Sequence, residues 1–379
     1  MSRNNKGGSA REGVPNTGAA AAEGPKAGMP HKKALLSLIT ALALVLLLLY
    51  SFFYLGKNPP ANQITPGTAA YASSNVVFGV ASSGNASAIR YAISNGLDYF
   101  RTDITNTPAQ ESLMANVSAE GGHYLGILDY QTLGANPGPS GCASNCNWTL
   151  STWNASVEAA LANYPEVHSW EIWNEPQISA YQGGFLNSTY NYFLMLKSAY
   201  RIIKAHNQSD TVVCLGGDNI YTGGPSPSYY DYLWAAQVWS YGASSYCNAI
   251  SLHAYTSFTY LMSDMPPGSN QTMGELFSEA LSAYENLTGK PIWITEVGIP
   301  SNNGAGVPIM LNDSEARQAL FLQQAYSLFL SKPYVRAVFW FNLEGYVHPP
   351  YEIDFGLLNA TTLAPKSSFE MLLKFIRGQ

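Results

Sequence analysis

Charged side chains are scarce in this chain. Asp, Glu, Lys and Arg make up only 12% of its 379 residues, about half the usual share. The surface must therefore be polar through uncharged side chains, and tyrosine alone accounts for 25 residues. Two explanations stay open. The protein works in acid, where carboxylates would be neutral and unbalanced lysines would repel one another, or it is a glycosylated surface protein at any pH.

Several common functional motifs are missing as well. The sequence has no Gly-rich phosphate loop, no His-Glu-x-x-His and no Gly-x-Ser-x-Gly, which argues against the nucleotide, zinc-protease and serine-hydrolase classes. An excess of basic residues is also lacking. The net charge is −6, and because residues 1–33 carry +4, the remainder carries −10. We therefore expect no nucleic-acid partner.

Only four cysteines occur, all in the second and third quarters of the chain: Cys142, Cys146, Cys214 and Cys247. An even number in an oxidising compartment suggests two disulfides. Cys142 with Cys146 would close a Gly/Pro-rich loop, and Cys214 with Cys247 could tie neighbouring strand regions. No His/Cys spacing supports metal binding, so neither a metal nor a cofactor is expected.

The single long hydrophobic run, Ala34 to Leu55, has 22 residues without a charge, which is long enough to span a bilayer. Lys32 and Lys33 precede it, so the positive-inside rule places a disordered tail, residues 1–33, in the cytoplasm and the rest of the chain outside the cell. A cleaved signal peptide is the alternative. However, the cleavage-like Ala70-Tyr71-Ala72 lies 17 residues past Leu55, and the run exceeds the usual apolar region of about 7–15 residues.

The predicted organisation is thus a tail (1–33), a transmembrane anchor (34–55), a Pro-containing linker (56–72) and one exported domain (73–379). Glycosylation signals agree with export, since every Asn-x-Ser/Thr sequon follows the anchor. The sequons begin at Asn85, Asn116, Asn147, Asn154, Asn187, Asn207, Asn270, Asn286, Asn312 and Asn359.

Short apolar runs alternate with longer amphipathic segments in the exported domain. The eight runs are Val76–Val80, Leu97–Asp103, Tyr124–Tyr130, His168–Asn174, Thr211–Gly216, Ala249–Tyr255, Pro291–Glu296 and Arg336–Leu343. Helix-like stretches between them include Ala86–Asn95, Trp153–Asn163, Tyr190–His206, Met273–Thr288 and Ser314–Ser331. This alternation predicts parallel βαβ units. Eight units fit an α/β fold of the (β/α)8 TIM-barrel type, closed by a last helix at Ser367–Arg377.

Polar side chains gather where these runs end, which is where a barrel of this kind carries its chemistry. The residues concerned are Arg101, Asp103, Asp129, Asn174, Glu175, Asp218, His253, Tyr255, Glu296, Trp340, Asn342 and Glu344. Two of them, Glu175 and Glu296, close strand-like runs four and seven. Because glycosidic bonds are cleaved by a pair of carboxyl groups, we interpret these two as an acid and a nucleophile or base.

Five further side chains would serve this pair. Asn174 would bind a sugar hydroxyl, Arg101 and Tyr255 would keep the nucleophile ionised, His253 would orient the acid, and Trp340 would form an aromatic floor. Each of the last four has a structural alternative: a barrel-filling salt bridge for the arginine and core packing for the others.

Three residues near the fourth run have no firm role. Glu171 is left unassigned, because strand alternation alone does not fix the face that it occupies. Trp148 and Trp153 form either an outer sugar platform or ordinary packing.

The string Trp173-Asn174-Glu175-Pro176 followed by Glu296 resembles clan A of the retaining glycoside hydrolases, the cellulase, mannanase and β-xylosidase type. The resemblance covers roughly residues 74–379. It implies Glu175 as acid/base and Glu296 as nucleophile, about 5–5.5 Å apart. One departure is clear, since many cellulase-type members have a His after the third strand and this chain has Leu128-Asp129-Tyr130-Gln131.

These observations together predict a membrane-anchored, extracellular retaining glycoside hydrolase that degrades β-linked polysaccharides or oligosaccharides. Two alternatives stay open. A barrel without activity would be a cell-surface carbohydrate-binding or structural protein, and fold alone does not exclude it. A transglycosylase would use the same residues but transfer the sugar to another sugar rather than to water.

Overall fold

The structure is a computed structural model that describes residues 76–378, except 83, 135–146, 179–180, 221–226, 257–260, 266–268, 302–314 and 346–353. The side chains of residues 227–230 are also outside the description. All described residues belong to one compact unit, Ala69–Gln379. The predicted tail, anchor and linker, and the loop with Cys142 and Cys146, therefore lie outside the described residues.

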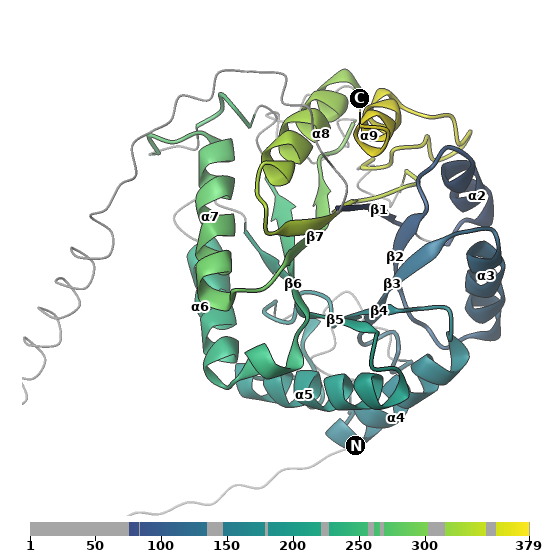
Figure 1. Ribbon diagram of the computed structural model, residues 1–379, viewed down its shortest axis with the longest axis vertical. Helices are drawn as coiled ribbons and strands as arrows, with labels where there is room; N and C mark the ends of the chain where they lie inside the picture. The colour runs from purple at the N-terminus through teal and green to yellow at the C-terminus, as the bar shows by residue number, and fades with distance from the viewer. Residues whose placement is uncertain are drawn as a thin grey trace, which may run out of the picture. The chain divides into compact units, whose positions relative to one another are not determined.

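Eight parallel strands form a closed barrel in which each strand pairs with the next and β8 pairs with β1 (Figure 1). Every one of the eight predicted runs overlaps one of these strands. They are β1 (Val77–Ala81), β2 (Tyr99–Asp103), β3 (His123–Leu128), β4 (Ser169–Ile172), β5 (Thr211–Asn219), β6 (Ala249–Tyr255), β7 (Ile292–Gly298) and β8 (Val335–Trp340). The prediction of a (β/α)8 barrel is confirmed.

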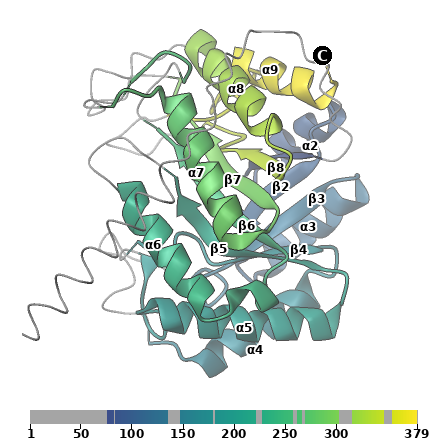
Figure 2. The same ribbon diagram turned by 60° about the vertical axis from the view of Figure 1, so that its left-hand side comes forward.

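Helices surround this ring of strands on its outer side (Figures 1 and 2). They are α2 (Ala86–Ser94), α3 (Pro108–Ala119), α4 (Leu150–Asn163), α5 (Thr189–His206), α6 (Pro227–Ser240), the short 3-10 helix η3 (Ala243–Tyr246), α7 (Met273–Thr288), α8 (Glu315–Leu330) and α9 (Ser367–Ile376). The helix-like stretches and the closing helix of the prediction are confirmed, whereas α3 and α6 were not predicted.

Local sequence explains where several helices begin. Asn85 caps α2 by accepting from the backbone of Ser87 and Ala88, and Thr272 with Glu275 forms a reciprocal capping box at the start of α7. Such caps satisfy backbone N–H groups that have no partner within the helix. Gly289 ends α7 with a positive φ of 59°, which a glycine adopts without steric cost.

The lower half of the barrel interior is apolar. Phe339 and Trp293 stack there with ring centroids 6.2 Å apart, and Tyr99 meets Phe339 edge-on. The neighbouring strand residue Gly79 leaves room for this ring, because a Cβ at that position would lie 2.3 Å from Phe339. The remaining members of this layer are Leu125, Val213, Ala249 and Ala337. The larger core lies between the strands and the helices.

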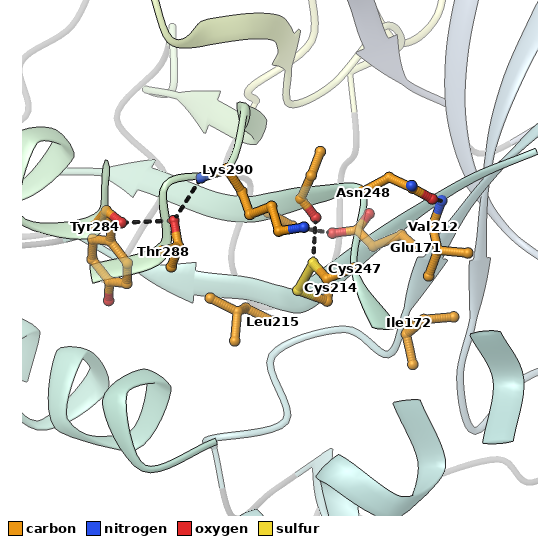
Figure 3. The surroundings of a disulfide bond; sticks show 12 residues. Glu171, Ile172, Val212, Cys214, Leu215, Cys247, Asn248, Tyr284, Thr288 and Lys290 are labelled. Atoms are coloured by element: carbon orange, nitrogen blue, oxygen red, sulfur yellow. Dashed lines mark hydrogen bonds between the residues drawn. A yellow bond between two sulfur atoms is a disulfide. The ribbon is translucent and has the colours of Figure 1, made fainter. Parts of the chain in front are cut away.

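One predicted disulfide is present between Cys214 on β5 and Cys247, just before β6 (Figure 3). Beside it, the Asn248 side chain accepts from the backbone N–H of Val212 at 2.9 Å. The two strands are therefore joined covalently and by a side-chain hydrogen bond at the end of the barrel where β6 begins.

Two sequence predictions concern the surface and the membrane. None of the nine described sequon asparagines is buried, which leaves each accessible to modification. Across the described part of the chain, no helix is long and apolar enough to cross a membrane. The predicted span from Ala34 to Leu55 is not among the residues searched.

Candidate active site

The carboxyl ends of the strands meet at a pocket of about 240 Å³. Its walls come from β1, β2, β3 and β7 and from the residues that follow β1, β3, β4 and β8. The lining residues are Ala81, Ser82, Arg101, Thr102, Asp103, Ile127, Tyr130, Asn174, Glu296, Phe341 and Asn342. Three predicted site residues, Arg101, Asn174 and Glu296, thus line one pocket.

Arg101 organises the floor of this pocket. Its Nε donates to Glu171 Oε2 at 2.6 Å and its Nη1 to Glu296 Oε1 at 2.5 Å. A third bond runs from Nη2 to Asn174 Oδ1 at 2.8 Å. Burial disfavours the charged guanidinium, but the carboxylates of Glu171 and Glu296 outweigh it and raise the pKa of Arg101 above its ordinary value. The guanidinium stays charged and fixes three acceptors at once.

Glu171 is the buried anchor of that arginine. The side chain has no exposed surface and accepts hydrogen bonds from the hydroxyls of Ser251 and Thr295. Both oxygens are therefore occupied below the pocket, so Glu171 holds Arg101 rather than facing a ligand. Sequence reasoning left this residue unassigned. Its place within a short apolar run could have indicated a structural role, because an acidic residue in a buried strand needs a partner.

Glu296 is held as a carboxylate. Besides Arg101, the Tyr255 hydroxyl donates to its Oε2 at 2.5 Å. Burial raises the pKa of this carboxyl, but the charges of His253 and Arg101, with the Tyr255 hydrogen bond, lower it below its ordinary value. An ionised, oriented carboxylate at a pocket wall has the properties of a nucleophile.

His253 lies between the two predicted catalytic glutamates. Its Nδ1 is 2.9 Å from Glu175 Oε1, and its Nε2 is 3.5 Å from Glu296 Oε1. Burial lowers the pKa of this imidazole, yet the charges of Glu296 and Glu175 raise it above its ordinary value overall. The glycine at 217 makes the position possible, because a Cβ there would lie 2.1 Å from the imidazole Nε2.

A tight turn after β4 presents Glu175. Trp173 and Glu175 both adopt positive φ angles, 70° and 47°, a conformation that non-glycine residues rarely adopt. The Glu175 N–H donates to the carbonyl of Gly216 at 2.5 Å, and a Cβ on Gly216 would approach Pro176 and the Trp173 carbonyl to 2.7 Å. Local backbone strain of this kind is common at functional sites, and here it aims Glu175 at His253.

The aromatic residues near this turn are mostly structural. Trp148 and Trp153 are buried and pack against Trp173, with centroid distances of 5.4 and 5.9 Å. The hypothesis of an outer sugar platform at these two tryptophans is therefore wrong, and the packing alternative holds. These two tryptophans therefore pack against the residue that begins the strained turn, Trp173.

Trp340 is not the aromatic floor that the sequence suggested. It is fully buried, packs on Phe321 of α8, and its Nε1 donates to the carbonyl of Phe355 at 2.9 Å. Side chains alternate along a strand, so with Phe339 inside the barrel, Trp340 faces the helices. The next residue, Phe341, does line the pocket, and it precedes a cis peptide bond to Asn342.

Two more residues line the pocket. Tyr130 lines it and stacks in parallel with Tyr181, with ring centroids 6.3 Å apart. Asp103 lines it as well, two residues beyond Arg101 on β2. Tyr130 and Asp103 each close a predicted strand run, and this position marked them as candidates for the pocket. Position alone, however, does not tell which face of the strand a side chain occupies.

A comparison of the sequence with family models matches residues 205–352 to the glycosyl hydrolase catalytic core. The matched stretch covers less than half of the chain. The matched stretch includes His253, Tyr255 and Glu296, whereas Arg101 and Glu175 precede it. This match over the second half of the barrel agrees with the resemblance to clan A that Trp173-Asn174-Glu175-Pro176 and Glu296 carry.

Solved structures show the same fold at low identity. A family 39 glycoside hydrolase from Bacteroides cellulosilyticus WH2 matches with a TM-score of 0.56 and 20% identity, over 81% of this chain and 64% of that one. Xylanase 10B from Thermotoga maritima matches with 0.55 and 14%, over 82% and 98%. A β-D-glucuronidase from Dictyoglomus thermophilum matches with 0.53 and 13%, over 80% and 50%. A search of curated proteins finds no significant match.

Proposed function

We propose that this protein is a retaining glycosidase that cleaves β-linked polysaccharides or oligosaccharides, with Glu296 as nucleophile and Glu175 as acid/base. The observation that carries the proposal is the pair of glutamates on opposite nitrogens of one buried imidazole, with Arg101 and Tyr255 on the nucleophile. A retaining mechanism needs one carboxylate kept ionised and a second carboxyl that exchanges a proton.

The reaction follows from these positions in two steps. A carboxylate oxygen of Glu296 attacks the anomeric carbon while Glu175 gives its proton to the departing oxygen, which leaves as an alcohol. Glu175 then takes a proton from water, whose oxygen attacks the same carbon and releases Glu296 as a carboxylate. Asn174, fixed by Arg101, faces the pocket beside Glu296 and is placed to bind the 2-hydroxyl of the sugar.

The test uses the full-length protein and defined aryl β-glycosides. The native protein should release the sugar with its β configuration retained, observed by proton NMR before the product equilibrates. Glu296→Gln and Glu175→Gln should both be strongly impaired, whereas the surface variant Glu370→Gln should match the native protein. An inverted product would refute the retaining mechanism.

Two further outcomes discriminate the alternatives. Binding of oligosaccharides without turnover, unchanged in both glutamate variants, would identify a carbohydrate-binding protein. Products longer than the substrate would identify a transglycosylase. Because the same residues would serve both reactions, the acceptor decides the product, and we expect hydrolysis to dominate when water is the only acceptor.

The proposed site of action is outside the cell, on a membrane anchor formed by residues 34–55, with the N-terminus in the cytoplasm. Its support is the length of the uncharged run and the lysines before it. Sodium carbonate extraction of membranes should leave the protein in the pellet, and protease added to intact cells should digest residues 73–379. Release by carbonate would overturn the anchor.

A further inference from the structure

The pocket has an unusual balance of charge for its size. Arg101 is the only Lys or Arg among its lining residues, and each of its Nε, Nη1 and Nη2 atoms already donates to Glu171, Glu296 or Asn174. Two carboxyl groups, those of Glu296 and Asp103, line the same walls. A ligand therefore meets acceptors and negative charge, and the guanidinium is already engaged by the protein.

The loops outside the described structure add no Lys or Arg. The internal segments that the structure does not describe, between residues 76 and 378, contain no Lys or Arg in their sequence. The buried Lys366 pairs with Asp354 at 2.7 Å and also bonds Ser301. A sugar that carries a carboxylate would thus find no uncommitted Lys or Arg from these segments or among the lining residues.

Asp103 lies on the pocket side of its strand. Arg101 points into the barrel, and because side chains alternate along a strand, the residue two positions on has the same orientation. Asp103 is partly exposed at the pocket wall, so its carboxyl is available to sugar hydroxyls. This residue is the last one of β2, one layer above the guanidinium that fixes the nucleophile.

The adjacent carboxyl of Asp129 strengthens this assignment. Asp129 is fully buried, its Oδ1 accepts from the Gln131 N–H at 2.8 Å, and within the described residues its Oδ2 has no hydrogen-bond partner. Burial first, and then the charge of Asp103, raise the pKa of Asp129 well above its ordinary value. Burial and the charge of Glu296 also raise the pKa of Asp103, while the charge of Arg101 lowers it. The two carboxyls therefore titrate as a pair, of which Asp103 is the member that lines the pocket.

We propose that Asp103 restricts the glycone subsite to neutral sugars, by accepting hydrogen bonds from sugar hydroxyls and repelling the carboxylate of a uronic acid. This inference rests on the proposed function, because it names the substrate class of the same pocket. Like charges brought together in a site are strongly unfavourable. Hydroxyl groups, in contrast, supply the donors that a carboxylate acceptor needs.

The experiment compares substrates that differ only at C6. The full-length protein is assayed with 4-nitrophenyl β-D-glucoside and β-D-glucuronide, and with the matching galactoside and galacturonide. We expect kcat/KM for the better neutral member to exceed that of its uronide by about a hundredfold. A uronide that is hydrolysed as fast as its neutral partner, or faster, would overturn the proposal.

Variants at Asp103 separate specificity from general damage. Asp103→Asn should reduce the neutral-to-uronide ratio by about tenfold, because one negative charge leaves the pocket wall. Asp103→Glu keeps the charge and should retain the native ratio even if its rates fall. The control Glu370→Gln removes an exposed charge on α9, far from Asp103 in the sequence, and should leave the ratio unchanged. An Asn variant with the native ratio would refute the role of Asp103.

Binding provides a second readout that does not depend on turnover. Isofagomine and its uronic-acid analogue are titrated into the native protein by calorimetry. Preference for the neutral inhibitor in a protein that hydrolyses nothing would refute the proposed function and leave the selectivity standing. Equal or tighter binding of the acidic inhibitor would refute the selectivity itself.

Discussion

The two halves of the barrel interior are built from the same strands but from opposite kinds of side chain. The lower layer holds aromatic and aliphatic residues, with Trp293 stacked on Phe339. The upper layer, nearer the carboxyl ends of the strands, holds Arg101, Glu171 and Glu296, and Arg101 donates to both glutamates. Burial is nearly complete in both layers, so only the chemistry of the side chains differs.

This difference shows where stability and function are located in the fold. Apolar side chains lower the free energy of the folded state when they leave water, by about 25 cal/mol per Å². Buried charges must instead recover a desolvation cost through their partners, and the net result is often close to neutral. The upper layer is therefore retained for positioning charge, and the lower layer supplies the rigid base on which that charge is held.

The largest expected effect is at Glu296. Glu296→Gln removes the attacking carboxylate but keeps the side-chain volume and a hydrogen-bond acceptor for Arg101. We expect kcat/KM to fall by about 10⁴–10⁶-fold with little change in Tm, measured by initial rates and calorimetry. A variant that lost its fold instead would show that the upper layer is structural, and the contrast between the layers would disappear.

Arg101 should contribute both to the stability of the fold and to activity. Arg101→Met leaves Glu171 buried without its cation, and an unpaired buried charge costs about 3–5 kcal/mol of unfolding free energy. The same change removes the guanidinium from Glu296, so kcat/KM should also fall by at least about a hundredfold. Urea unfolding and initial rates measure the two effects. The exposed Arg90→Met is the matched control, because its partner Glu120 is largely in solvent.

Phe339 should affect stability alone. Phe339→Ala opens a cavity beneath Trp293 and should lower the free energy of unfolding by about 3–5 kcal/mol. Because the ring lies one layer below the pocket, kcat at a temperature where the variant is folded should stay within a few-fold of the native value. A loss of activity as large as that of Glu296→Gln would show that the two layers are not separable.

Tyr255→Phe tests how the upper layer sets the ionisation of Glu296. The Tyr255 hydroxyl helps lower the pKa of Glu296. Without this hydroxyl the pKa of Glu296 should rise, so that the carboxylate becomes protonated at a higher pH in the variant. The acidic limb of the kcat/KM profile should move upward in pH, with a fall of about 10–100-fold near the native optimum. An unchanged acidic limb would contradict the assignment.

The same lowered pKa has a consequence for stability. A carboxyl whose pKa is depressed in the folded state stabilises the protein above its unfolded pKa, and that contribution is lost as pH falls through the folded value. For Glu296 the loss therefore begins as the pH falls to the ordinary pKa of a glutamate and is complete only below the lowered folded value. Resistance to mild acid is compatible with the low charge of the chain, and a clearly acidic activity optimum would favour the acidic-environment explanation over glycosylation alone.

How far the sequence predicted the structure depended on periodicity. The eight strands were found because each is a compact apolar run, and α5 and α7 because their apolar residues recur on one face. The helices α3 and α6 were missed, since Pro108–Ala119 and Pro227–Ser240 distribute their apolar residues without a clear face. Two glutamates at the ends of the fourth and seventh runs could be predicted from position and chemistry.

The pocket aromatic of β8 was misassigned by one position, to Trp340 instead of Phe341. Trp340 and Phe341 are adjacent, and a single step along a strand exchanges the barrel interior for the helix layer. The strained turn at Trp173 and Glu175 breaks the alternation after β4, which is why the face of Glu171 could not be derived. Asp103 was noted at a strand end. Its proposed role in repelling a charged sugar could be inferred only from the structure, which shows that Arg101 is the only Lys or Arg lining the pocket and that its guanidinium is already bonded.

The imidazole between the two glutamates gives the proposed reaction a fixed electrostatic centre. In the first step negative charge leaves Glu296, which becomes an ester, and appears on Glu175, which has lost its proton. In the second step the charge returns. His253 contacts one glutamate through each nitrogen, so it faces one anion at every stage, first through Nε2 and then through Nδ1. The catalytic cycle can therefore run to completion with the net charge of the three groups constant.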